Sequence, residues 1–345
     1  METPQPRSLA QLLRSQVARA PLLSMGVVAV GACAAGVLLF WSVGFVLSPQ
    51  TSGNTSLRLS REAGKFTNPL LLCNVDQGKN FNEDKVLEKK VQTFIDTRIQ
   101  NGGASNMSLY ISNYNTGQWV GVNENDPYDP ASLFKVPLMI AYFQSAETNP
   151  SLLNQTLTFT GDNQNIDEHY RSAHDIVANT AYTTDDLIKS MILNSDNTAA
   201  VLLEQYLDKN SLSEVYTDLN LLPPSKSQPN SISAKKYAYF FRILYNATYL
   251  NHAFSEKALA LLSQASFPQG IRGGVPASVV VAQKFGERGI YSTDHILLES
   301  ELHDCGIVYK PSSPYLICIM SRGKNFDALS QNIRDLSSLV YKEIK

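Results

Sequence analysis

Residues 129–146 read DPASLFKVPLMIAYFQSA, and they decide how the rest of the chain is interpreted. The polar start and the apolar run behind it predict a buried helix. Ser132 falls on the first turn of this helix, with Lys135 one turn later on the same face. A serine hydroxyl needs a base to take its proton, and an amine serves where burial or a nearby cation lowers its pKa. The stretch therefore predicts a nucleophile and its base at a helix N-terminus, whose dipole favours an oxyanion.

The S-x-x-K spacing alone is not specific, because Ser233–Lys236 and Ser321–Lys324 repeat it. Two further motifs add the context. Ser195-Asp196-Asn197 lies between two predicted helices, and Lys284-Phe285-Gly286 ends a β-rich run. The motifs S-x-x-K, S-D-N and K-T-G, in this order, are the signature of class A β-lactamases and penicillin-binding proteins.

With two motifs matched and the third altered, residues 82–345 resemble the class A β-lactamase family of penicillin-recognising serine hydrolases. The resemblance implies that Ser132 attacks a β-lactam carbonyl or a D-alanyl-D-alanine peptide bond and forms an acyl-enzyme, with Lys135 as proton acceptor. It further implies that Ser195 relays a proton to the leaving nitrogen and that Asn197 holds the side-chain amide of the substrate.

The third motif would complete the substrate site by the same resemblance. Lys284 would attract the substrate carboxylate and help to keep Lys135 neutral, because a like charge nearby disfavours a second ammonium. The backbone N–H groups of Ser132 and of Glu287, which follows Gly286, would form the oxyanion hole. Phe285 stands where the family has a hydroxyl residue that binds the carboxylate. Ser292, Thr293 and Arg288 are candidates to replace that contact.

A second departure concerns deacylation. Class A β-lactamases use a Glu on a long loop between the second and third motifs as the base for a water molecule. Residues 219–255 contain no Asp or Glu, and the loop LLPPSKSQPNSIS is basic. Glu214 and Asp218 precede it, but their helical setting predicts surface carboxylates. We therefore expect a persistent acyl-enzyme.

Three functions remain open at this point. The first is a β-lactamase-like hydrolase, whose water could be activated by Lys135. The second is a peptidoglycan D,D-carboxypeptidase of the penicillin-binding type, which acts on the peptidoglycan stem peptide. The third is a non-catalytic, membrane-tethered module that binds the cell wall. The intact set of polar residues argues against the third, since a binding module has no chemical need for all of it. The set comprises Ser132, Lys135, Ser195, Asn197 and Lys284.

The expected fold is α+β, with an antiparallel sheet flanked by N- and C-terminal helices and an all-helical lobe on its other side. A helix from Asn82 to Gly102 and a hairpin around residues 115–117 open the domain. The middle is mostly helical, with helices from Thr184, over 196–207 and over 234–250. Strands over 278–282, 305–309 and 315–320 and an amphipathic helix over 325–344 close it.

The N-terminal part predicts a membrane anchor. Residues 22–47 are apolar and uncharged, enough to span a bilayer as one transmembrane helix and longer than the apolar core of a signal peptide. Arg7, Arg14 and Arg19 precede the span, so residues 1–21 are expected in the cytoplasm. Residues 48–81 read as a stalk, and the domain at 82–345 is expected outside the cytoplasmic membrane.

Composition bears on nucleic-acid binding, on metal and cofactor binding, and on disulfide formation. The 29 Lys and Arg against 31 Asp and Glu give a formal charge of −2, which offers no general attraction to nucleic acid. The four cysteines and five histidines show no metal-ligand spacing, so neither metal nor cofactor is expected. Cys305 and Cys318 fall on two strands joined by a short turn and can form a disulfide in an exported protein, with Cys73 as an alternative partner.

Overall fold

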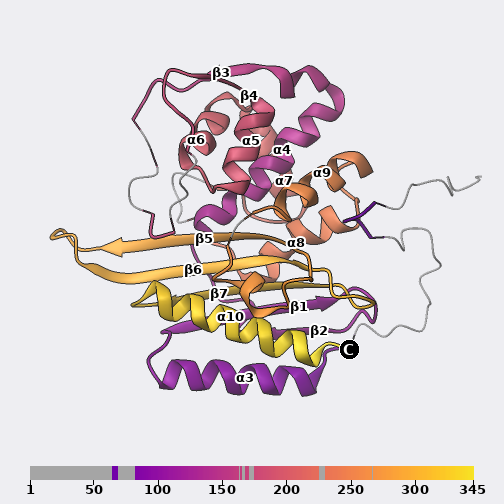
Figure 1. Ribbon diagram of the computed structural model, residues 1–345, viewed down its shortest axis with the longest axis vertical. Coiled ribbons are helices and arrows are strands. Elements are labelled where there is room, and N and C mark those ends of the chain that lie inside the picture. Colours follow the sequence, from indigo (N-terminus) through magenta and orange to yellow (C-terminus); the bar gives the residue numbers. More distant parts are fainter. Residues whose placement is uncertain are drawn as a thin grey trace, which may run out of the picture. The chain divides into compact units, whose positions relative to one another are not determined.

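The computed structural model describes residues 64–68, 82–162, 164, 168–170, 175–224, 230–265 and 267–345. A five-stranded antiparallel sheet of order β2-β1-β7-β6-β5 forms its middle layer. Two long helices cover one face and a helical lobe lies on the other (Figure 1). The strands of this sheet are β1 (Asn106–Asn113), β2 (Trp119–Val122), β5 (Val281–Tyr291), β6 (Leu297–Val308) and β7 (Tyr315–Gly323), and β3 (Thr156–Thr158) and β4 (Ala181–Thr183) form a small second sheet. The helices are α3 (Lys85–Gln100), α4 (Lys135–Thr148), α5 (Thr184–Leu193), α6 (Asn197–Tyr206), α7 (Lys209–Asp218), α8 (Ala234–Tyr245), α9 (His252–Leu262) and α10 (Phe326–Glu343), with a 3-10 turn η1 (Ala131–Phe134) before α4.

The helices from the two chain ends, α3 and α10, lie side by side on one face of the sheet, as the sequence predicts (Figure 1). Asp84 caps α3 by accepting the backbone N–H groups of Val86 and Leu87 at 3.1 and 3.0 Å. Leucine, valine and isoleucine side chains at helical spacing on both helices pack against the sheet and form one apolar core with it. The predicted α+β architecture is therefore confirmed.

The helical lobe differs from the prediction in two places. Helix α8 ends at Tyr245 rather than at Leu250. Ala247 directly beyond its cap has a φ of 46°, a left-handed backbone conformation that cannot continue a helix. The short strands β3 and β4 interrupt the expected all-helical stretch, and the chain between them passes the mouth of the site described below.

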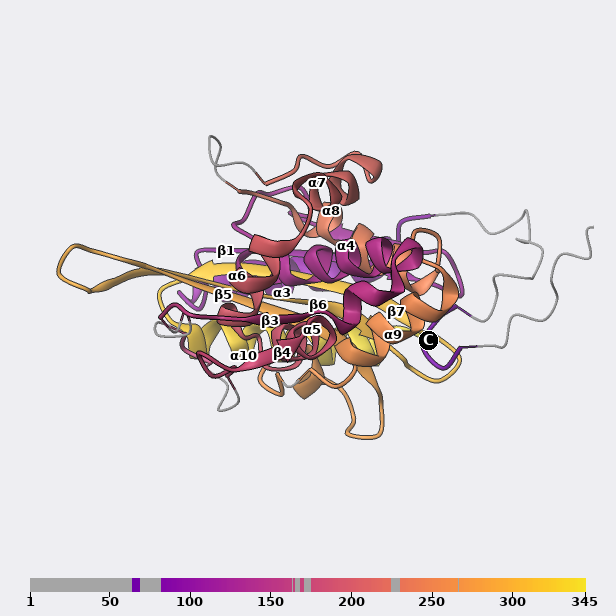
Figure 2. The same ribbon diagram turned by 90° about the horizontal axis from the view of Figure 1, so that it is seen from above.

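The third motif does not end its strand, as the sequence suggested. Strand β5 begins at Val281, runs through Lys284 and continues to Tyr291, paired throughout with β6. The β5–β6 hairpin thus extends beyond the neighbouring strands in both views (Figures 1 and 2). The sequence GERG (286–289) contains two glycines and two charged residues, which are typical of a loop. The hydrophobic pattern alone therefore predicted an end of the strand that lies too early in the chain.

The expected disulfide joins Cys305 and Cys318, which face each other in register on β6 and β7. Cys73 lies outside the described residues. Both bridged cysteines are fully buried, and the bond joins the central strand β7 to its neighbour β6.

Replacing both cysteines, in Cys305→Ala/Cys318→Ala, is expected to lower the free energy of unfolding by about 3 kcal/mol, because the bridge closes a loop with a sequence separation of 13 in the unfolded chain. Guanidinium unfolding measures the change. Reducing the wild type separates this effect from the loss of buried sulfur atoms, and an unchanged midpoint on reduction would contradict the prediction.

The N-terminal predictions fall largely outside the described residues, including the span over residues 22–47. Among the residues that are described, no helix has the length and apolar character to cross a membrane. Residues 64–68 belong to the predicted stalk and contact the domain. The backbone N–H groups of Phe66 and Thr67 donate to the carboxylate of Glu256 on α9, at 2.9 and 3.0 Å. The Tyr309 hydroxyl donates to the Phe66 carbonyl at 2.8 Å.

Candidate active site

Ser132 lies in η1 rather than in the first turn of an α-helix as predicted. Asp129 builds this turn, because its carboxylate accepts the backbone N–H of Ala131 at 2.9 Å. The carbonyl of Pro130 then accepts the N–H of Leu133 at 3.0 Å. The turn leads directly into the buried helix α4, so the Ser132 hydroxyl is held at the entrance of the lobe.

Lys135 lies beneath Ser132, with only 3% of its surface exposed. Its Nζ is 2.9 Å from the Ser132 Oγ, 3.1 Å from the Ser195 Oγ and 2.6 Å from the Asn197 Oδ1. It also donates to the Ser195 carbonyl. Burial lowers the pKa of Lys135 to about 8. An amine with such a pKa is partly neutral near physiological pH and can accept the serine proton.

The second motif lies between α5 and α6 and is held by a buried carboxylate. Asp196 accepts the backbone N–H of Ile176 at 2.8 Å, the hydroxyl of Ser190 at 2.9 Å and the N–H of Ala199 at 3.1 Å. Ser195 has a φ of 57°, a costly conformation for a non-glycine residue. These bonds hold the turn, which directs Ser195 and Asn197 toward Lys135.

The third motif closes the other side of the site. The Nζ of Lys284, fully buried, donates to the Ser195 Oγ at 2.9 Å and to the Phe285 carbonyl at 3.0 Å. Burial, and then the neighbouring Lys135, hold the pKa of Lys284 well below its usual value. The Ser195 hydroxyl therefore lies between two amines, as a proton relay requires.

Strand β5 passes directly against η1 at Gly286. A Cβ at this position would lie 2.8 Å from the Pro130 carbonyl oxygen and 2.9 Å from the Leu133 nitrogen. Only glycine allows this approach. The approach brings Glu287 on β5 next to Ser132 on η1. The family resemblance implies that the backbone N–H groups of these two residues form the oxyanion hole.

The other two S-x-x-K matches are not comparable sites. The Ser233 Oγ caps α8 by accepting the Lys236 N–H at 3.4 Å, and the Lys236 side chain is exposed. The Ser321 hydroxyl is buried and donates to the Leu302 carbonyl at 2.6 Å, with Lys324 exposed. Only the pair at 132 and 135 places the hydroxyl against a buried amine.

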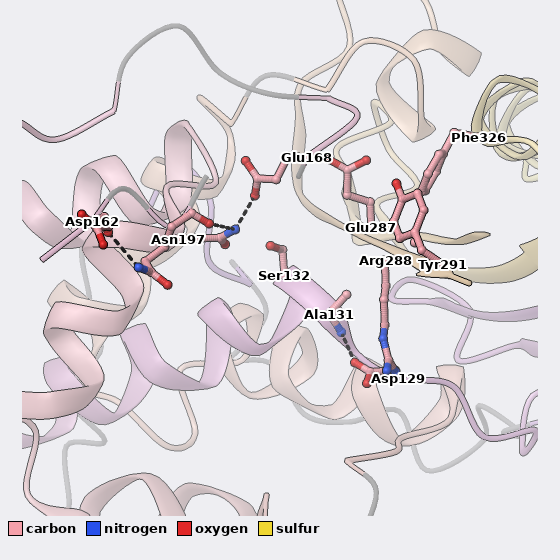
Figure 3. Close-up of a pocket in the computed structure, with 12 residues that line it drawn as sticks. Asp129, Ala131, Ser132, Asp162, Glu168, Asn197, Glu287, Arg288, Tyr291 and Phe326 are labelled. Carbon is pink, nitrogen blue, oxygen red and sulfur yellow. Dashed lines mark hydrogen bonds and ion pairs between the residues drawn. The ribbon is translucent and has the colours of Figure 1, made fainter. Parts of the chain in front are cut away.

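A cavity of about 700 Å³ opens above Ser132 (Figure 3). Its lining is strongly polar. The pocket is formed from η1, α6, β5 and the segment between β3 and β4, and its polar residues include Ser132, Asp162, Glu168, Asn197, Glu287 and Arg288. Ser132, Asn197 and Glu287 thus line one pocket. Lys135, Ser195 and Lys284 are joined to it by hydrogen bonds, and the catalytic roles of all six residues are predictions.

Glu168 is a pocket residue that the sequence did not reveal. Its Oε1 accepts the Asn197 Nδ2 at 2.8 Å, which connects it through Asn197 to Lys135. Burial raises the pKa of the Glu168 carboxyl. A carboxylate here can take a proton from water or hold a cation. No sequence signal marks it, because it lies between the first and second motifs and not between the second and third.

Glu287 contributes its side chain as well as its backbone. Its Oε1 accepts the backbone N–H of Tyr170 at 2.9 Å and so fastens the segment that carries Glu168 to strand β5. Burial raises the pKa of the Glu287 carboxyl, and Glu168 raises it further. Glu214 and Asp218 are exposed on α7, as predicted, and neither lines the pocket.

Comparison with known proteins gives a consistent assignment. The sequence model of the beta-lactamase enzyme family matches residues 86–344. The structure resembles that of a single-substitution mutant of PBP-A in an acyl-enzyme complex with penicillin G, at 21% identity and a TM-score of 0.64, over 75% of this chain and 96% of that chain. It also resembles a class A β-lactamase from Mycobacterium abscessus, at 18% identity and a TM-score of 0.60, over 73% of this chain and 98% of that one. At these identities the similarity shows the fold. No curated protein matches the chain.

Proposed function

The chain belongs to the beta-lactamase enzyme family and is a serine hydrolase, and we propose that Ser132 forms an acyl-enzyme with β-lactams or with D-alanyl-D-alanine-type peptides. One observation carries the proposal. The Ser132 Oγ lies 2.9 Å from the amine of Lys135, whose pKa burial lowers to about 8. This is the arrangement that activates a serine hydroxyl.

The chemical steps follow from the contacts. Lys135 takes the proton as the Ser132 Oγ attacks the carbonyl carbon, and the N–H groups of Ser132 and Glu287 stabilise the oxyanion. When the carbon–nitrogen bond breaks, the leaving nitrogen takes a proton from the Ser195 hydroxyl, which is 3.1 Å from Lys135 and is reprotonated by it. Water or an acceptor amine then releases the acyl group.

Two versions of this function differ in the last step. Fast release by water makes a β-lactamase, and slow release makes a penicillin-binding peptidase. The lack of an acidic residue over 219–233 favours slow release, whereas Glu168, a pocket carboxylate that can take a proton from water, favours fast release. The connected network from Ser132 to Lys284 argues against a silent binding module.

We further propose that the enzyme is a single-pass membrane protein with its catalytic domain outside the cytoplasm. The apolar run over 22–47 supports the anchor. The bridge between Cys305 and Cys318 supports the compartment, because disulfides persist in oxidising environments. Membrane fractionation, with protease added to intact cells, tests both statements. Resistance of the domain to protease would contradict this orientation.

The first test is mass spectrometry of the purified full-length chain mixed with benzylpenicillin. We expect an adduct of the intact drug on Ser132, and none on Ser132→Ala. An adduct that persists for hours indicates the peptidase type, and one that turns over with release of opened drug indicates the β-lactamase type. No adduct on the wild type would contradict the proposed function.

The pH dependence of acylation tests the role of Lys135. With a pKa of about 8, the neutral fraction of this amine rises about tenfold per pH unit below that value and then levels off. The second-order rate constant should therefore rise roughly 50- to 100-fold between about pH 6 and 9. A rate that is flat over this range would assign the proton to another acceptor.

A further inference from the structure

His303 is a fully buried histidine that the proposed chemical steps do not use. It lies on β6 directly opposite Gly286, where β5 comes against η1. Its Nε2 is 2.9 Å from the backbone carbonyl oxygen of Asp129, and the backbone N–H of Ser321 on β7 donates to its Nδ1 at 3.3 Å. The ring therefore links the sheet to the chain that leads into the nucleophile turn.

These two contacts determine which ring nitrogen of His303 carries the proton. A backbone N–H can only donate, so the Nδ1 that faces the Ser321 N–H is an acceptor without a proton. Burial lowers the pKa of His303 to about 4, so the ring is neutral at neutral pH and its proton lies on Nε2. The Nε2–H consequently donates to the Asp129 carbonyl.

The turn that His303 supports has a strained backbone. Ala131, the residue before Ser132, has a φ of 46°, a left-handed conformation that is costly for a residue other than glycine. Such a conformation persists only where the surrounding structure holds it. The Asp129 carboxylate accepts the Ala131 N–H at 2.9 Å (Figure 3), and the carbonyl of the same Asp129 accepts from His303. Asp129 therefore passes the support of the sheet to the nucleophile.

Other contacts hold neighbouring parts of the turn but not this carbonyl. Beyond the nucleophile, the Tyr237 hydroxyl donates to the Leu133 carbonyl at 2.8 Å. The Tyr128 ring packs across the His303 ring, with centroids 5.4 Å apart. Within the part of the chain that the structure describes, His303 is the donor to the Asp129 carbonyl, and no second donor reaches that oxygen.

We propose that His303 is a positioning residue for the nucleophile. Its Nε2–H fixes the Asp129 carbonyl, and through it the strained backbone that keeps the Ser132 hydroxyl at Lys135. His303 does not line the pocket, so it acts through η1 alone. The inference rests on the proposed acylation of Ser132 and adds a residue of the sheet to the groups that this step requires.

Two substitutions of His303 separate the donor from the ring. The amide nitrogen of His303→Gln can take the place of Nε2 and donate to the Asp129 carbonyl. The shorter His303→Asn can only take the place of Nδ1 and accept the Ser321 N–H, so the donor to Asp129 is lost. Both variants remove the ring and leave a polar side chain of similar kind, which makes them a matched pair.

Acylation of the full-length chain by benzylpenicillin measures the effect. Quench-flow mass spectrometry over a range of drug concentrations separates the rate constant at saturation from the drug concentration that gives half of it. We expect the rate constant at saturation to fall about 100-fold in His303→Asn, because a small misplacement of a reacting group has an effect of this size. His303→Gln should stay within about fivefold of wild type, and the half-saturating concentration should not change in either variant.

Two controls accompany the pair. Tyr128→Phe removes a hydroxyl that lies 2.9 Å from the Ser108 Oγ, in the same buried segment, but it leaves the bond to the Asp129 carbonyl and should acylate at the wild-type rate. Thermal unfolding confirms that each variant is folded. NMR of the ring nitrogens in the wild-type chain, isotopically labelled at histidine, should show the His303 proton on Nε2 at neutral pH. This measurement needs no substitution to fold, and a proton on Nδ1 would overturn the inference by itself.

The remaining outcomes separate this inference from the function beneath it. Equal rate constants at saturation in His303→Gln and His303→Asn would show that the donor to Asp129 does not position the nucleophile, while the acyl-enzyme itself would stand. A change confined to the half-saturating concentration would assign His303 to drug binding and would also overturn the inference. No adduct on the wild-type chain would contradict the proposed function, and the inference would fall with it.

Discussion

Replacing Lys135 with methionine should lower the rate constant of Ser132 acylation about 10³-fold, the usual range for loss of a general base. Lys135 is 3% exposed and lies among apolar residues of α4, so an unbranched apolar side chain can take its volume. The fold should therefore survive while the proton acceptor 2.9 Å from the serine oxygen is lost. Adduct formation with benzylpenicillin measures the rate.

The chain provides its own control for this experiment. Lys236 stands in the same spacing after Ser233, but its side chain is exposed and Ser233 only caps a helix. Lys236→Met should therefore acylate at the wild-type rate. The dependence on pH near 8 should also disappear in Lys135→Met, because the group that titrates there is gone. A Lys135→Met enzyme within about tenfold of wild type would identify a different base.

The parts of this fold that the sequence predicts are those that local chemistry determines. The helix at 85–100 follows from Asp84 as its cap and from Leu87, Val91 and Ile95 at helical spacing. The bridge between Cys305 and Cys318 follows from two strands joined by a short turn. The three motifs lie in one site because each contributes a polar group that needs the others, and their order along the chain was enough to find them.

The parts that escaped prediction depend on distant contacts. Glu168 belongs to the site only because Asn197 and, through Tyr170, Glu287 hold its segment over the pocket, and no spacing along the chain records that contact. Strand β5 continues past Gly286 because β6 pairs with it, although the residues there have low strand propensity. In both cases contacts between distant parts of the chain determine the structure, and the local sequence pattern does not.

Replacing Asp196 with alanine should lower the free energy of unfolding by about 3–5 kcal/mol, the largest stability effect expected of a single site residue. Asp196 is fully buried and accepts hydrogen bonds from Ile176, Ser190 and Ala199, and its loss leaves three donors without these partners. It also removes the N-cap of α6. Guanidinium unfolding of the full-length chain measures the change.

Asp208 provides the matched comparison, because it caps the next helix but is exposed, and among the described residues its side chain accepts only the Asn210 N–H, at 2.9 Å. Asp208→Ala should cost about 1 kcal/mol, the usual value of an N-cap, and leave acylation unchanged. Asp196→Ala should slow acylation where it remains folded, since Ser195 keeps its left-handed backbone only while the turn is held. Equal unfolding midpoints for the two variants would show that Asp196 acts as a cap alone. A larger loss in Asp196→Ala together with slower acylation would show that the buried carboxylate supports both the fold and the position of the relay serine.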